Sequence, residues 1–182
     1  MEPSGQSAAG PGAGQPTQYL TFQMAGETFA VSILQVKEIL PVDTITRVPS
    51  TPRSIRGVMN LRGSVVPVVD LAVKIGFGES VVSRRSCVVI VEVTVHDQKI
   101  VMGILVDAVS QVIELRAEEI EPPPSFGTKV TVDCLIGMGR AGKRFILVLD
   151  IDRAIGLEEI AAAQTRPQPG QGGPAQETGD AA

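Results

Sequence analysis

Short apolar runs separated by turn residues dominate the chain between residues 17 and 163. Residues 18–24 alternate apolar and polar positions, Ala25-Gly26-Glu27 read as a turn, and residues 28–32 return as the second strand of a hairpin. Further strands are predicted at 44–48, 55–60, 64–70, 87–95, 99–107, 110–116, 133–139 and 143–151. The gaps between these runs are too short for crossover helices, so the pattern predicts a mostly β fold of about ten strands.

Helical periodicity is confined to three short segments. Residues 33–40 place Ile33, Val36, Ile39 and Leu40 on one face and stop at Pro41, which cannot continue a helix. We expect this helix to plug one end of a barrel. A short turn at 71–75 and a C-terminal helix at 151–163 complete the helical pattern.

Several strands are apolar at consecutive positions, as in residues 65–69 and 88–91. Such runs indicate strands that are covered on both faces, which one open sheet does not provide. The pattern therefore predicts two small barrels packed together along a shared apolar seam.

Composition limits the folded part of the chain and its partners. Hydrophobic residues make up 43% of the 182 residues, enough for a core, whereas residues 1–16 and 164–182 consist mainly of Gly, Pro, Ala, Gln and Ser and are predicted to be disordered tails. The folded domain is therefore expected at 17–163. A net charge of −4 and an aromatic content of 3% without Trp argue against a nucleic acid partner.

The chain shows no sign of export or membrane insertion. No basic segment followed by an apolar stretch opens it, and no run approaches the roughly 18 uncharged apolar residues of a membrane span. We therefore expect a cytoplasmic protein. Cys87 and Cys134 lie in apolar runs, which favours buried free thiols over a disulfide.

Residues for catalysis or metal binding are scarce. His96 is the only histidine and lies in a predicted hairpin tip, and two cysteines cannot complete a structural zinc site. The acidic groups Glu118-Glu119 and Glu158-Glu159 lie in polar stretches and are read as solvated surface. No catalytic site, metal site or cofactor is expected.

The segment Gly137 to Arg144 (GMGRAGKR) is close to a phosphate-binding loop. That loop requires Ser or Thr after the lysine and a helix after it, but Arg144 takes the hydroxyl position and residues 145–149 read as a strand. We predict a hairpin turn in which Gly142 adopts a positive φ. A small nucleotide-binding protein that uses this loop is the alternative function, and it predicts stabilisation by magnesium-ATP.

Asp70 ends an apolar strand, as the phosphoacceptor of a receiver domain does. The doubly wound scaffold, partner acids and lysine of such a site are not visible, so Asp70 is predicted to cap the turn at 71–75.

A binding module remains once these chemistries are set aside. Residues 55–63 place Asn60 and Arg62 next to glycines that allow close approach of a partner. Arg62 either contacts a partner or satisfies carbonyl groups of its own loop, and both interpretations stay open at this point.

The run from Asn60 to Leu71 (NLRGSVVPVVDL) resembles the signature of the bacterial chemotaxis coupling protein family CheW. Further segments are similar to that family in order and spacing: Phe22 to Ala30 (FQMAGETFA), Ile33 to Leu40 (ILQVKEIL), Thr46 to Pro52 (TRVPSTP), Gly103 to Val112 (GILVDAVSQV) and Ile136 to Gly139 (IGMG). The resemblance covers about residues 17–160, which is essentially the whole predicted domain.

The resemblance implies two intertwined, five-stranded SH3-like barrels and no catalytic residue or cofactor. It implies a scaffold that links methyl-accepting chemoreceptors to the histidine kinase CheA, whose regulatory domain has the same fold. Such a protein is expected at the inner face of the membrane through receptor arrays.

The resemblance also nominates contact residues. In the family, receptor tips lie against a groove between the barrels, and the matching positions here are Val36, Glu38, Ile39, Arg62, Val88, Gly103 and Val112. Phe126 matches a family aromatic used in contacts between the coupling protein and the kinase, whereas Glu121 stands where better-known members have a basic residue.

Overall fold

The computed structural model describes residues 14–42, 45–123, 132–156 and 159–161, and within them the chain is mostly β. The strands are β1 Thr17–Met24, β2 Glu27–Ser32, β3 Val36–Pro41, β4 Ile55–Leu61, β5 Ser64–Asp70, β6 Cys87–Val95, β7 Gln98–Val106, β8 Ala108–Leu115, β9 Leu135–Ala141 and β10 Arg144–Leu149. The helical segments are η1 Ile33–Gln35, α1 Leu71–Lys74, η3 Ala117–Glu119, η4 Val132–Cys134 and α2 Ile151–Ala154. No helix in these ranges is long and apolar enough to cross a membrane.

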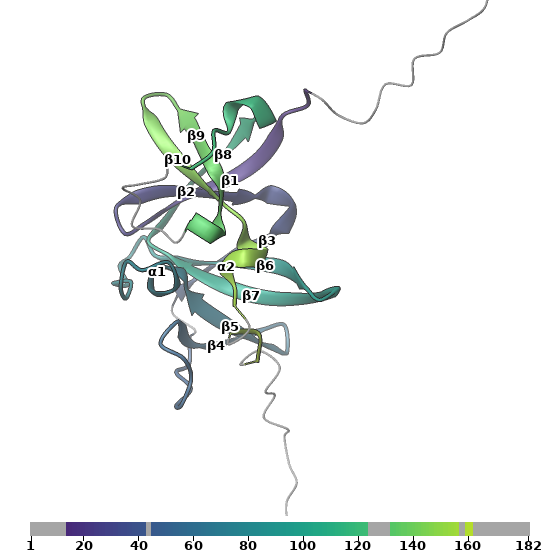
Figure 1. The fold of residues 1–182 in the computed structure, drawn as a ribbon. Helices are drawn as coiled ribbons and strands as arrows, with labels where there is room; N and C mark the ends of the chain where they lie inside the picture. Colours follow the sequence, from purple (N-terminus) through teal and green to yellow (C-terminus); the bar gives the residue numbers. More distant parts are fainter. Residues whose placement is uncertain (1–13, 43–44, 124–131, 157–158, 162–182) are drawn as a thin grey trace, which may run out of the picture.

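The strands form two five-stranded sheets, each curled into a small barrel, as predicted (Figure 1). We call the sheet ordered β8-β1-β2-β10-β9 the first barrel and the sheet ordered β3-β6-β7-β5-β4 the second barrel. The first barrel combines the N-terminal hairpin β1–β2 with the C-terminal strands β8 to β10, whereas the intervening strands β3 to β7 form the second barrel. The two barrels are therefore intertwined. Backbone bridges between Glu121 and Met138 and between Thr46 and Val58 close the first and the second barrel.

The two barrels repeat one another in strand order and in detail. Strands β3 to β7 correspond in turn to β8, β9, β10, β1 and β2. The same spacing relates Gly57 to Gly137 and Asp70 to Asp150, and a Cβ on either glycine would collide with the carbonyl oxygen that closes its barrel. The fold therefore contains an internal repeat, so each position on one barrel has an equivalent position on the other.

Residues 33–40 do not form the predicted helix. Only η1 is helical, and β3 follows it as an edge strand paired with β6, with half-buried and exposed side chains alternating along it. The apolar residues of β6 need a neighbouring strand, and this long-range pairing outweighs the local helical pattern. Pro41 ends an edge strand, where a missing backbone N–H is tolerated. The strand predicted at 44–48 is likewise wrong for residues 45–48, where Thr46 alone pairs, through one bridge, and residue 44 lies outside the described residues.

An apolar seam joins the barrels, as predicted. Phe22 and Phe29 of the first barrel pack in one cluster with Val89 and Ile104 of the second, and α1 and α2 contribute to the same cluster. Figure 1 shows both short helices at the level where the two sheets meet. Each barrel also has a smaller apolar interior of its own.

The C-terminal helix predicted at 151–163 is also different. Helix α2 ends at Ala154 because Ile155 is extended, with φ −91° and ψ 114°, and residues 159–161 are helical again. Ile155 and Ile160 both enter the seam, which a straight helix would not allow. The remaining predicted helical positions, 157–158 and 162–163, and the predicted tails at 1–13 and 164–182 lie outside the described residues.

The two cysteines are free thiols, in agreement with the prediction. Cys87 is half-buried and Cys134 is buried, and burial raises the pKa of both thiols. Both are therefore protonated at neutral pH and weak nucleophiles.

Candidate functional site

A groove of about 540 Å³ opens on the second barrel between β3, the start of β7 and the β4–β5 hairpin. Its walls mix apolar side chains with charged ones; the lining includes Lys37, Glu38, Leu61, Arg62, Val65 and Lys99. Val65 is 54% exposed, and Ile39 of β3, next to the lining residue Glu38, is 44% exposed. A partner that presents apolar and acidic side chains together would fit this surface.

Strand pairing brings the charged residues of the groove together. Glu92 of β6 lies between two lysines, with Lys37 Nζ at 2.9 Å and Lys99 Nζ at 3.2 Å from its carboxylate oxygens. Hydrogen bonds from the two lysines, with Lys37 contributing more than Lys99, lower the pKa of Glu92. The carboxylate thus holds both lysine side chains over the groove. Neither lysine was predicted as a site residue, because only the pairing of β3, β6 and β7 makes them neighbours.

Glu38 and Arg62, both nominated from the sequence, meet across the groove. Arg62 Nη2 lies 3.4 Å from Glu38 Oε2, and the Arg62 side chain is 82% exposed. Arg62 occupies the turn of the β4–β5 hairpin with φ 50°, followed by Gly63 with φ 84°, the conformation of a tight hairpin turn. Arg62 thus contacts Glu38 on another strand and not a carbonyl of its own loop.

The other nominated residues are dispersed. Val36 lies on β3, half-buried against the seam, and Ile39 lies further along the same strand with its side chain exposed. Val112 is 48% exposed but belongs to β8 of the first barrel. The strand registers place Val112 at the position equivalent to Ile39, so the two residues mark the same surface on different barrels.

Val88 and Gly103 lie inside the second barrel. Val88 has no exposed surface, and a Cβ on Gly103 would lie 2.6 Å from Val88 Cγ1. Neither residue presents a side chain to a partner in this conformation. Their effect on any contact would be indirect, through the packing that supports the groove.

Of the two residues nominated for the kinase contact, Glu121 lies within the described residues and Phe126 does not. Glu121 is exposed, and its backbone exchanges hydrogen bonds with Met138 at 2.8 and 2.7 Å. Phe126 lies outside the described residues. The kinase contact stays a prediction.

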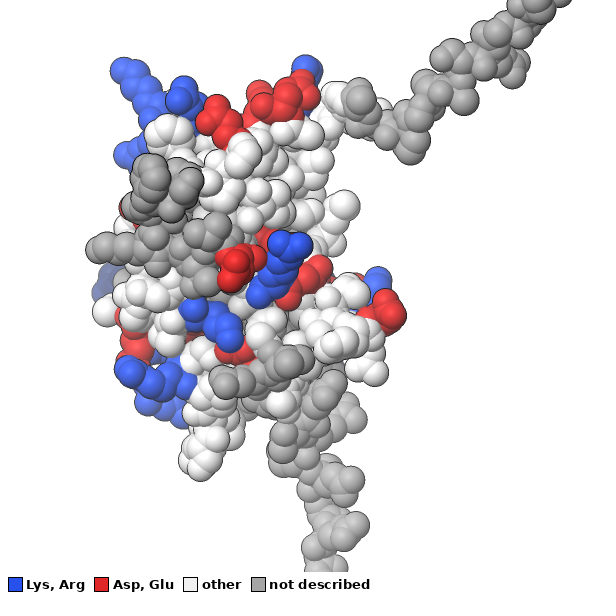
Figure 2. Space-filling view, viewed as in Figure 1, with Lys and Arg blue, Asp and Glu red and all other residues white. Residues whose placement is uncertain are grey.

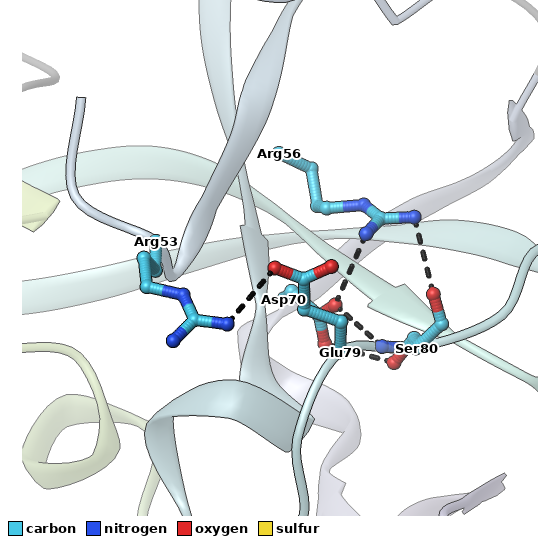
Figure 3. Close-up of polar contacts among 5 residues, drawn as sticks. All are labelled: Arg53, Arg56, Asp70, Glu79 and Ser80. Carbon is cyan, nitrogen blue, oxygen red and sulfur yellow. Dashed lines mark hydrogen bonds and ion pairs between the residues drawn. The ribbon is translucent and has the colours of Figure 1, made fainter. Parts of the chain in front are cut away.

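Asp70 is not the helix cap that the sequence predicted. It occupies the position before α1 but its side chain makes no capping hydrogen bond. Instead the fully buried carboxylate accepts 2.8 Å hydrogen bonds from the amide and the hydroxyl of Ser80, and Arg56 Nη1 lies 3.8 Å away (Figure 3). Arg56 also donates to the Ser80 carbonyl at 3.1 Å.

This buried cluster explains why the helix cap predicted at Asp70 does not form. A carboxylate held by an amide, a hydroxyl and a guanidinium satisfies its acceptors away from water. It ties the loop after α1 to the end of β5, a partnership between residues ten positions apart that no local pattern indicates. An exposed pair, Arg53 with Glu79 at 3.4 Å, lies beside it (Figure 3).

The segment Gly137 to Arg144 forms the hairpin that the sequence predicted. Gly142 has φ 63°, and β10 follows the turn directly, so no helix N-terminus faces it. His96 lies exposed in the turn between β6 and β7. Among the described residues no group of three or more His, Cys, Asp or Glu side chains is arranged to hold a metal ion.

Comparisons with known proteins agree with this architecture. The family model described as CheW-like domain matches residues 18–159. The chain is 39% identical over 144 residues to the chemotaxis protein CheW of Klebsiella aerogenes, covering 79% of this chain and 84% of that protein. It is 28% identical over 145 residues to the chemotaxis protein CheW of Treponema pallidum, with 79% and 84% covered.

A solved structure has the same fold. The scaffolding protein TtCheW from Thermoanaerobacter tengcongensis superposes with a TM-score of 0.70 and 30% sequence identity. The match covers 84% of this chain and 96% of that one.

Proposed function

This chain belongs to the CheW family of chemotaxis scaffold proteins, and from that premise we propose that it couples methyl-accepting chemoreceptors to a CheA-type histidine kinase. In this proposal the protein is an adaptor without catalytic activity or cofactor. It resides in the cytoplasm, at the inner face of the membrane, through its receptor partners.

The groove on the second barrel is the observation that carries the receptor contact. A receptor tip is an α-helical hairpin, and the apolar face of a helix can lie on Val65 in the groove while its acidic residues meet the groove's cations; Ile39, exposed on β3 beside the groove, is a further proposed contact. The ion pair of Glu38 with Arg62 then orients the partner through charge. Val36, half-buried against the seam, and Val112, on the first barrel, remain proposed receptor contacts outside the groove, whereas buried Val88 and Gly103 support the strands beneath the groove.

The kinase would bind a different surface. The family resemblance nominates Glu121 and Phe126, and Glu121 is exposed beside β9 of the first barrel. Because the groove lies on the second barrel and Glu121 on the first, one molecule could hold both partners at once. Single contacts of this kind are weak, and an array gains strength from many of them acting together.

The nucleotide-binding alternative has little support. Most of the candidate segment belongs to strand β9, only Gly142 and Lys143 form the turn, and Arg144 begins β10. A melting curve with magnesium-ATP tests it directly, since a ligand that binds the folded state raises the melting temperature.

Binding to a receptor cytoplasmic fragment and to a CheA-type regulatory domain tests the proposal. We expect micromolar binding to each, and Ile39→Glu should weaken the receptor contact about tenfold or more while leaving kinase binding unchanged. Arg62→Ala should act in the same direction without lowering the melting temperature, because the side chain is exposed. Arg84→Ala, at an exposed arginine away from the groove lining, is the matched control.

If the protein binds neither the receptor fragment nor the kinase regulatory domain, the adaptor proposal is refuted. Receptor binding that survives both Ile39→Glu and Arg62→Ala would instead move the receptor site away from this groove.

A further inference from the structure

The β9–β10 hairpin of the first barrel carries three exposed cations within five residues: Arg140, Lys143 and Arg144. None of them takes part in an ion pair within the described part of the chain. The Arg140 guanidinium lies over the ring of Phe145, 5.0 Å from its centroid, and Phe145 is itself 51% exposed. The protein thus leaves an uncompensated positive charge and an exposed aromatic ring at one tip, although its net charge is −4.

The internal repeat gives this tip a counterpart. In strand register, Phe145 pairs with Arg140 as Val65 pairs with Asn60, and Ile146 is buried as Val66 is. The β9–β10 hairpin therefore occupies on the first barrel the place that the groove-lining β4–β5 hairpin occupies on the second. At that place the first barrel presents a larger apolar side chain and more positive charge.

The surroundings of the tip restrict the kind of partner. Figure 2, viewed as Figure 1, shows basic side chains gathered at the end of the first barrel where this hairpin lies, with acidic side chains next to them. Glu118 and Glu119 of η3 are exposed, and Ile120, which follows η3, packs against Gly137 of β9, the strand that leads to the hairpin turn. A broad polyanion, such as an anionic membrane or a nucleic acid, would meet these carboxylates as well as the cations.

We propose that the β9–β10 hairpin binds a short acidic segment of a partner protein. Carboxylates of that segment pair with Lys143 and Arg144, and an apolar side chain next to them packs on the Phe145 ring. A narrow extended segment covers the hairpin alone and avoids the acidic residues of η3. This site is separate from the groove proposed for the receptor and does not depend on it.

Fluorescence anisotropy with a fluorescein-labelled peptide of repeated Glu-Glu-Leu units tests the proposal on the full chain. We expect saturable binding that weakens as NaCl rises from about 0.05 to about 0.3 M, because the charges involved are exposed. The double substitution Lys143→Gln with Arg144→Gln should weaken binding about tenfold or more. Phe145→Ala should weaken it as well, without a change of charge.

The control variant Arg84→Gln with Arg85→Gln removes the same charge from exposed positions elsewhere and should bind the peptide as the parent protein does. A single Arg144→Gln variant, intermediate in affinity, replaces the double substitution if the latter lowers the melting temperature. The proposal is overturned by no binding, by equal binding of a Gln-Gln-Leu peptide, or by an equal loss in the control variant. Tighter binding to phosphatidylglycerol vesicles or to a DNA duplex would also overturn it.

Discussion

Lys74 Nζ lies 3.1 Å from Glu159 Oε2, so an ion pair joins α1 of the second barrel to the chain that follows the last strand of the first barrel. The other oxygen of Glu159 accepts a 2.5 Å hydrogen bond from Ser54 Oγ, and the amide of Gly156 donates to Oε2 at 2.9 Å. The Glu159 side chain is only 1% exposed. One buried carboxylate therefore fastens the C-terminal segment to the second barrel.

Glu159→Gln should lower the free energy of unfolding by about 3 kcal/mol. Removing one partner of a buried pair leaves the other charge uncompensated, and the loss lies at the low end of the usual range because Lys74 is 28% exposed. Urea denaturation measures the change. Glu118→Gln, which alters an exposed carboxylate with a 4.0 Å ion pair, should change stability by less than about 1 kcal/mol. Equal losses in the two variants would contradict the role given to Glu159.

The stability that Glu159 contributes should depend on pH in one direction. Burial acts to raise the pKa of this carboxyl, but the hydrogen bonds from Ser54 and Lys74 outweigh it and hold the pKa below its ordinary value of 4.5. The contribution is therefore complete above pH 4.5 and is lost as the pH falls through the lower value of the folded state. The stability difference between the parent protein and Glu159→Gln should shrink over that acidic range. A difference that stays constant there would refute the assignment.

Asp70→Asn and Asp150→Asn compare equivalent positions of the two barrels. Asp70 is fully buried, so the amide would lose the charge that faces Arg56 and place an N–H group among the donors of Ser80; we expect a loss of about 2–4 kcal/mol. Asp150 caps α2 through the amide of Arg153 at 3.2 Å, a role that Asn performs well, so its loss should stay below about 1 kcal/mol. Denaturation curves of the two variants measure the contrast, and hydrogen exchange at the Ser80 amide should accelerate only in Asp70→Asn. Similar losses at both positions would contradict the distinction between cluster and cap.

Gly103→Ala should destabilise the second barrel by about 1–3 kcal/mol, because its methyl group would overlap Val88. Val88→Ala makes room at the same point, so the double variant should lose less than the sum of the two single losses. Thermal unfolding of the three variants provides the cycle. Additive losses would show that the two positions act independently, against the packing described for them.

The hairpins and the two-barrel architecture follow from local signals in the chain. Alternating runs around Ala25-Gly26 and around Gly142 specify strand, turn and strand within a few residues, and the consecutive apolar residues at 66–69 indicate cover on both faces and are all buried. These features involve neighbours in sequence, so residue types alone determine them. The resemblance to the family was equally a property of the sequence.

Tertiary pairing decided the features that local patterns misjudged. Residues 33–40 have a helical apolar face, yet the uncovered edge of β6 makes most of them a strand. Asp70 has the position of a cap, yet Ser80 and Arg56 take its carboxylate into a buried cluster. Val88 and Ile39 look alike as apolar residues, and only the closed barrel sends one inward and the other to the surface.

The groove is the clearest case of this division. The sequence alone determined that Glu38, Ile39 and Arg62 were worth attention, but it said nothing of Lys37, Glu92 and Lys99, which lie on three different strands. Their charges meet because β3, β6 and β7 pair side by side. Charge arrangement across strands is a property of register, and register is set by burial of the whole sheet and not by any one segment.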